Sequence, residues 1–119
     1  MHAWQFARAL GIAERNGWTR FVSMQNLVNL LYREEEREML PLCAAEGIGV
    51  IPWSPQARGR LTRDRDYTSI RTETDESITR LFAHSVEADR KVVDRVAAVA
   101  AARGIPRAQS HWLGYCPSR

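Results

Sequence analysis

Three kinds of side chain in this sequence could take part in chemistry: a carboxamide, an indole ring and a group of arginines. Gln25 ends a stretch of β-preferring residues, Trp53 ends a second one, and the arginine-rich segment 56–71 follows. Taken singly, each has a simpler explanation. Gln25 could cap a strand end, Trp53 could be core packing rather than a stacking platform, and the arginines could be a solvated surface.

Other candidates for acid–base or metal chemistry are scattered along the chain. The acidic run at 34–36 stands in the first turn of an expected helix, where the helix dipole favours negative charge, so we interpret it as a solvated helix start rather than a metal site. The histidines are isolated from one another, and we interpret each as a surface residue: His2, His84 and His111. Cys43 and Cys116 form no CxxC pair and are typical of a reduced, intracellular protein.

Composition narrows the class of protein. The chain has 119 residues, of which 45% are hydrophobic and 26% charged, which is typical of a globular domain. Its net charge is +3, but acidic and basic residues alternate along most of the chain, so we expect no nucleic-acid partner. We see neither a signal peptide nor an apolar run of the ~20 residues that a membrane span needs, and we predict a cytoplasmic protein without a membrane partner.

The elements that must position these residues alternate in type. Hydrophobic periodicity predicts a helix over 3–16 with Trp4, Ala7, Leu10 and Ala13 on one face, then a strand over 19–25. A second helix is predicted over 33–46, with Pro41 as a source of a kink, and a second strand over 50–53. Strands and helices at this spacing indicate an α/β protein with parallel strands and a right-handed crossover.

The second half of the chain is expected to hold no further strand. Residues 54–84 have little apolar periodicity and are predicted to form a long loop, 87–103 form the clearest helix, and another helix begins within 105–109. Residues 110–119 lose all pattern. Two parallel strands leave open sheet edges, so we expect poor solubility or self-association through those edges.

Four segments of the sequence resemble aldo-keto reductases, and in particular bacterial ones. They are 21–26 (FVSMQN), 29–41 (NLLYREEEREMLP), 47–55 (GIGVIPWSP) and 57–62 (ARGRLT). The family fold is a (β/α)8 TIM barrel, which needs ~250 residues. The resemblance therefore implies a partial barrel, from about helix 5 to helix 7, in a domain at 1–109, followed by a divergent tail at 110–119.

The resemblance also implies roles for particular residues. Gln25 matches the residue that hydrogen-bonds the nicotinamide carboxamide of NADPH, and Trp53 matches the aromatic residue that stacks on the nicotinamide ring. Arg58 and Arg71 could hold phosphate charge. The loop along the pyrophosphate matches Ser54, Pro55, Gln56, Ala57, Arg58 and Gly59. Two departures weaken the match, because the family often has His-Tyr in place of Leu27-Val28 and leucine in place of Gln56.

The implied reaction is the reduction of an aldehyde or ketone to an alcohol, in which NADPH gives a hydride and a tyrosine gives a proton. The family's catalytic Asp, Tyr, Lys and His are expected before Met1, and Tyr32, Tyr67 and Tyr115 have no matched partners, so no catalytic residue is assigned. We expect the isolated chain to be inactive. The alternatives are a partial subunit completed by another chain, and a nucleotide- or nucleic-acid-binding module that uses 56–71.

Overall fold

A computed structural model describes residues 1–63 and 86–110 of the chain. These residues form two compact units. The first unit contains Met1–Val28 and Tyr32–Trp53, and the second contains Asn29–Leu31 together with the described part of Ser54–Arg119. Within the described residues, no helix is both long and apolar enough to cross a membrane.

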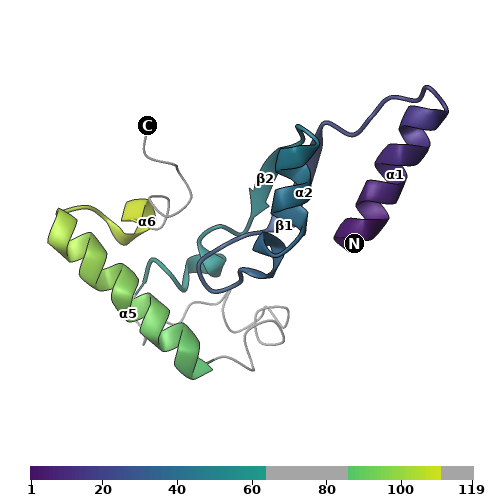
Figure 1. Cartoon of the computed structure of the whole chain (residues 1–119). Coiled ribbons are helices and arrows are strands. Elements are labelled where there is room, and N and C mark those ends of the chain that lie inside the picture. Colours follow the sequence, from purple (N-terminus) through teal and green to yellow (C-terminus); the bar gives the residue numbers. More distant parts are fainter. Residues whose placement is uncertain (64–85, 111–119) are drawn as a thin grey trace. The chain divides into compact units, whose positions relative to one another are not determined.

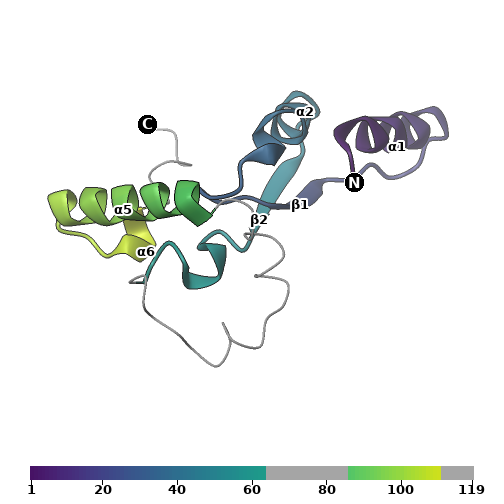
Figure 2. The ribbon, with the colours of Figure 1, turned by 90° about the horizontal axis from the view of Figure 1, so that it is seen from below.

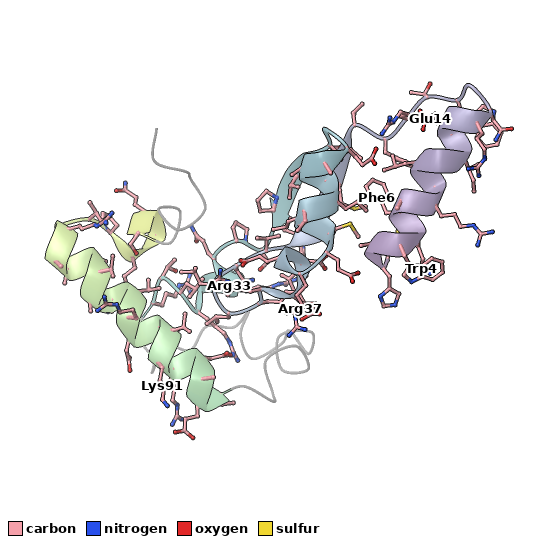
Figure 3. All side chains as sticks on the ribbon, in the orientation of Figure 1. Trp4, Phe6, Glu14, Arg33, Arg37 and Lys91 are labelled. Atoms are coloured by element: carbon pink, nitrogen blue, oxygen red, sulfur yellow. The ribbon has the colours of Figure 1, made fainter. Side chains whose placement is uncertain are left out.

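The first unit begins with helix α1, Ala3–Arg15, as the sequence predicts. Its buried face is formed by Phe6, Leu10 and Ala13, which recur at helical spacing. The prediction that Trp4 and Ala7 lie on this face is wrong, because Trp4 is 61% exposed and Ala7 is also exposed. Figure 3 shows Phe6 pointing from α1 toward helix α2.

Two parallel strands form the sheet of the first unit. Strand β1 is Ser23–Leu27 and strand β2 is Gly49–Trp53, paired in register from Ser23 with Gly49 to Leu27 with Trp53. Figure 2 shows the two strands running alongside each other. The predicted start of the first strand at residue 19 is wrong, because pairing begins only where β2 begins and the preceding residues have no partner strand among the described residues.

The hydrogen bonds of this pair show which backbone groups face outward. Gly49 N–H donates to Val22 O, and Val28 N–H donates to Trp53 O. In a parallel strand each residue directs its N–H and C=O to the same side, and successive residues alternate sides. The backbone groups of the odd-numbered residues of β1 therefore point away from β2. On β2 the outward residues are Val50 and Pro52, and Pro52 has no N–H to donate. The outer edge of β1 is therefore the better template for a further strand.

The predicted helix at 33–46 is in fact two elements. A 3-10 turn, η1, spans Glu34–Glu36, and helix α2 spans Met39–Ala45. Pro41 explains the break, because its ring would clash with the carbonyl of a continuous helix four residues earlier. In α2 it lies in the first turn, where backbone N–H groups have no partner within the helix.

One face of the sheet is covered by helices. Figure 1 shows α2 lying along the strand pair, and α1 and α2 contact each other. The core between them consists of Phe6, Leu10, Met39, Cys43 and Ile48, with Met24 and Val50 of the sheet packed against it. Since side chains alternate along a strand, the opposite face of the sheet carries the odd-numbered residues of both strands.

The second unit is built around helix α5, Val86–Arg103, close to the predicted 87–103. A 3-10 turn, η2, spans Ala57–Gly59, and a short helix, α6, spans Arg107–Ser110 and contacts α5. The core of this unit contains Ala57, Leu61 and Val96, with Leu30, Leu31, Val92 and Val93 packed against it. The first part of the predicted loop at 54–84 is thus packed against α5, and residues 64–84 of it lie outside the described residues.

Candidate functional site

The open face of the β1–β2 sheet carries both residues that were predicted to meet a nicotinamide. Gln25 pairs with Ile51, and Leu27 pairs with Trp53, so Gln25 and Trp53 lie on one face of neighbouring strands, two residues apart in register. Gln25 is exposed and Trp53 is 41% exposed. This face therefore offers an amide and an indole side by side, on strands rather than on flexible loops.

The predicted location of Gln25 at the end of its strand is wrong. Strand β1 continues to Leu27, so Gln25 occupies its middle position. The continuation arises because β2 runs on to Trp53, and Val28 N–H still reaches Trp53 O at 3.4 Å. The residues before and after Gln25, Met24 and Asn26, are both paired with β2. This pairing fixes the backbone of Gln25 more firmly than a position at the strand end would.

The segment that follows Trp53 has an unusual backbone. Ser54, Ala57 and Arg58 have φ angles of 51°, 46° and 55°, and Gly59 has 96°. A residue with a Cβ in the left-handed region costs about 1–2 kcal/mol, so three of them need compensating interactions nearby. Such strain in a surface turn is typical of a binding site, where the chain must present a particular shape.

Buried side chains supply that compensation within the second unit. Asn29 is fully buried, and its Nδ2 donates to Ser54 O at 3.2 Å. Ala57 and Leu61 are also fully buried, and they pack against Val96 of α5. The sequence analysis did not identify Asn29. The only signal was its residue type, because an asparagine side chain often accepts from the backbone N–H two residues later and so forms an Asx turn.

A partly buried ion pair also connects this segment to α5. Arg60 Nη1 lies 3.6 Å from Asp89 Oδ2, and the Asp89 side chain is 10% exposed. This oxygen makes no hydrogen bond within the described residues, so the contact with Arg60 is its electrostatic compensation. Asp89 is a second residue that the sequence did not single out.

Four of the other residues predicted to contact phosphate lie around the η2 turn, and a fifth lies outside the described residues. Pro55, Gln56, Arg58 and Gly59 are all half-buried around the η2 turn. The backbone N–H groups of Ala57, Gly59 and Arg60 donate to carbonyls inside the turn. Any phosphate contact would therefore come chiefly from side chains such as the Arg58 guanidinium. Arg71 lies outside the described residues.

Tyr32 is the one tyrosine among the described residues, and its surroundings do not suit a proton donor. Burial raises the pKa of Tyr32, and Glu35 and Glu34 raise it further. A general acid works best when its pKa lies near the operating pH, so this shift is in the wrong direction. The only lysine of the sequence, Lys91, is exposed on α5, where Figure 3 labels it.

A pocket of about 520 Å³ adjoins Tyr32 in the first unit, but it is unsuited to a dinucleotide. Its lining includes Glu34, Glu35 and Glu38, and carboxylates repel phosphate groups. Arg37, also in the lining, pairs with Glu34 at 3.1 Å. Neither residue of the open sheet face lines it, so we place the candidate site on the sheet face and not in this pocket.

Comparison with known proteins gives these observations a family context. A model of the aldo/keto reductase family matches residues 2–111. The chain is 48% identical over 111 residues to a versiconal hemiacetal acetate reductase of Aspergillus parasiticus, covering 92% of this chain and 32% of that protein. Two aldo-keto reductases, from Fusarium vanettenii and Alternaria alternata, are each 44% identical over 108 residues, covering 89% of this chain and 29% of theirs.

The chain thus spans a third or less of the length of these curated relatives. All three are fungal proteins, whereas the sequence resemblance was drawn to bacterial members. The family itself was predicted correctly. Its fold is a (β/α)8 barrel, and the parallel strands β1 and β2 connected through α2 match the repeating unit of such a barrel. By its sequence and by this α/β architecture, the chain belongs to the aldo/keto reductase family.

Proposed function

We propose that this chain provides part of the NADPH site of an aldo-keto reductase that reduces aldehydes or ketones, and that the chain alone does not catalyse the reduction. The observation that carries the proposal is the shared face of Gln25 and Trp53. Their strands fix them in register, two residues apart, on the face opposite the one that α1 and α2 cover. In the family these positions meet the nicotinamide.

The residues present fit a nicotinamide by their chemistry. An exposed indole offers a flat face on which a planar ring can stack, and a carboxamide can donate and accept hydrogen bonds with another carboxamide. When bound, NADPH would supply the hydride. Gln25 and Trp53 would orient the ring, so that one of its faces is covered by the indole.

The η2 turn fits a phosphate separately. Its backbone is strained at Ser54, Ala57 and Arg58, and it is held in that shape by buried neighbours. Arg58 brings positive charge to the turn, and an arginine is well suited to phosphate oxygens. The structure of this unit therefore supports the role that the family resemblance implies for 54–59.

The proposed lack of activity rests on the absence, within residues 1–63 and 86–110, of a tyrosine suited to donate a proton. Carbonyl reduction needs a proton on the developing alkoxide, and the family uses a tyrosine with lysine and histidine neighbours. Burial raises the pKa of Tyr32, and Glu35 and Glu34 raise it further, which is the wrong direction for a proton donor. We therefore propose that the catalytic groups come from elsewhere, and we place this chain at helix 5 to helix 7 of the barrel.

Two measurements test the proposal. Calorimetric titration of the full chain with NADPH should show binding that the Trp53→Ala variant weakens about tenfold, since aromatic stacking contributes about 0.5–1.5 kcal/mol beyond area burial. Trp18→Ala is the matched control, because Trp18 is also exposed but lies outside the strands. Equal losses in both variants, or no binding by the unaltered chain, would rule out this cofactor site.

Turnover is tested with the same protein. Incubation with NADPH and a nitro-substituted benzaldehyde should give no oxidation of NADPH above the rate without protein. Turnover that survives rigorous purification would contradict the proposed lack of activity while leaving the cofactor site intact. A chain that gains activity only when mixed with a polypeptide carrying the remaining strands of the barrel would support a partial subunit.

We further propose that the isolated chain associates with itself through the outer edge of β1. Ile51 and Trp53 are 50% and 41% exposed on the uncovered face, and the outward backbone of β1 has its full set of donors and acceptors. Edge pairing would satisfy the outward backbone groups of β1, and packing of the open faces of two copies against each other would bury Ile51 and Trp53, without requiring any other protein.

A further inference from the structure

We propose that Asn29 is a positioning residue that holds the strained turn after β2 in its binding shape, through a hydrogen bond to Ser54. This inference deepens the proposed phosphate role of 54–59 and rests on it. Asn29 lies 25 residues before Ser54 in the sequence, but both belong to the second compact unit. No chemistry is assigned to Asn29 itself.

The side chain of Asn29 is fixed at both ends of its amide. Its Nδ2 donates to Ser54 O at 3.2 Å, and its Oδ1 accepts from Leu31 N–H at 3.0 Å. The second bond forms an Asx turn, which sets the plane of the amide. With the oxygen held by Leu31, the amide NH₂ is directed at Ser54, and complete burial keeps water from replacing either bond.

The carbonyl that Asn29 contacts is the point from which the turn develops. Ser54 O also accepts from Ala57 N–H at 2.9 Å, so its two acceptor sites are both used. Ser54 has φ 51°, and the turn that it opens contains two more non-glycine residues with positive φ, Ala57 and Arg58. A strained carbonyl held from two directions cannot rotate without breaking a buried hydrogen bond.

Aspartate, serine and alanine would each fail to replace Asn29 in this role. Aspartate has the same shape and could still accept from Leu31, but it would turn a carboxylate oxygen toward the Ser54 carbonyl. Serine is too short to bridge both groups, and alanine would leave the Ser54 carbonyl with one bond fewer. The position therefore requires a donor and an acceptor on one short, planar group.

Hydrogen–deuterium exchange of the full chain tests the inference directly. Asn29→Ala should raise the exchange rates of the turn amides in 54–61 by about tenfold, the upper range for a lost buried hydrogen bond, while 86–103 in α5 exchanges as before. Asn29→Asp should act in the same direction. Asn16→Ala is the matched control, because Asn16 Nδ2 also donates to a backbone carbonyl, Ile12 O, but on the surface of α1.

A double-mutant cycle adds a readout that a general packing role would not change. Glycine adopts positive φ without the Cβ penalty, so Ser54→Gly should remove much of the need for the clamp. The effect of Asn29→Ala on turn exchange should then be at least threefold smaller in the Ser54→Gly background. Titration with NADP⁺ should show affinity losses of about three- to tenfold for Asn29→Ala and almost none for Asn16→Ala.

The outcomes separate the inference from the proposed function. Unchanged exchange at 54–61 in both Asn29 variants, or an equal rise at 54–61 and 86–103, would overturn the positioning role. An additive cycle would do the same. If the unaltered chain fails to bind NADP⁺, the proposed function falls, and the exchange data still decide whether Asn29 holds the turn.

Discussion

The two regions that we propose to contact the cofactor, one in each unit, are supported in opposite ways. The sheet face with Gln25 and Trp53 has relaxed strand geometry, but it is open on one side and leaves large apolar groups exposed. The η2 turn has a strained backbone, but buried side chains surround its base. The side chains on the strands are thus positioned by strand pairing but have no layer packed over them within the described part of their unit. The turn is positioned by the buried side chains that pack beneath it.

The largest test of this contrast removes an anchor. Leu61→Ala should lower the free energy of unfolding by about 2–5 kcal/mol, because Leu61 is fully buried in the core of the second unit. Ile51→Ala, on the half-exposed sheet face, should cost well under half as much. Urea unfolding followed by circular dichroism measures both. Similar losses of unfolding free energy in the two variants would show that Ile51 is more buried in solution than in this structure.

A smaller effect is expected from the ion pair that connects the turn to α5. Arg60→Gln should destabilise the protein by about 1–2 kcal/mol, less than the ~3–5 kcal/mol of a fully buried pair, since the Arg60 side chain is 36% exposed. Arg33→Gln is the control from the first unit, because its 2.6 Å pair with Glu36 is on the surface. That variant should change stability by less than ~0.5 kcal/mol.

Self-association should respond to the sheet face and not to the turn. Ile51→Lys should raise the dissociation constant for self-association by about tenfold or more, because a charge on an apolar contact face must be desolvated on association. Light scattering across a concentration series measures it. Arg58→Lys, which keeps the charge in the η2 turn, should leave association unchanged, and an equal effect of both variants would point to another contact surface.

The smallest expected effect is a fall in stability at alkaline pH that comes from the first unit. Burial raises the pKa of Cys43 above its usual 9.0, with a contribution from Glu35, and burial with nearby carboxylates raises the pKa of Tyr32 above its usual 10.0. The folded chain therefore holds these protons more tightly than the unfolded chain does. The contribution of these two groups to stability should be fully present below about pH 9 and should be lost as pH rises from there.

The combined variant Cys43→Ala, Tyr32→Phe is the control for this pH dependence. Its absolute stability will differ because the core changes, so the comparison is between slopes of unfolding free energy against pH. The slope above pH 9 should be shallower in the variant. An unchanged slope would assign the alkaline loss to groups other than Cys43 and Tyr32.

Much of the local structure could be predicted from the sequence. Helical spacing gave α1 and α5 to within a residue at each end, and the alternation of elements predicted the parallel pair. The start of β1 and the split before α2 could not be obtained in this way. The first depends on where β2 begins, and the second depends on how the chain accommodates Pro41.

The site was harder to predict than the fold. The family resemblance identified Gln25 and Trp53, and strand alternation then explains why they share a face. Asn29 and Asp89 were missed because their importance comes from burial and from contacts 25 and 29 residues away along the chain. The positive φ angles at Ser54, Ala57 and Arg58 were equally hidden, since none of these residues is a glycine.

The proline on the outward edge of β2 has a consequence for how far this sheet can extend. A strand that paired with β2 at Pro52 would meet a carbonyl but no N–H at that position, so one carbonyl of the incoming strand would lack a hydrogen-bond donor. The outer edge of β2 is therefore the weaker template of the two, with Val50 as its one outward residue that has both a donor and an acceptor. Fibrils that add strands at both borders of the sheet should therefore form less readily than pairs joined at the edge of β1.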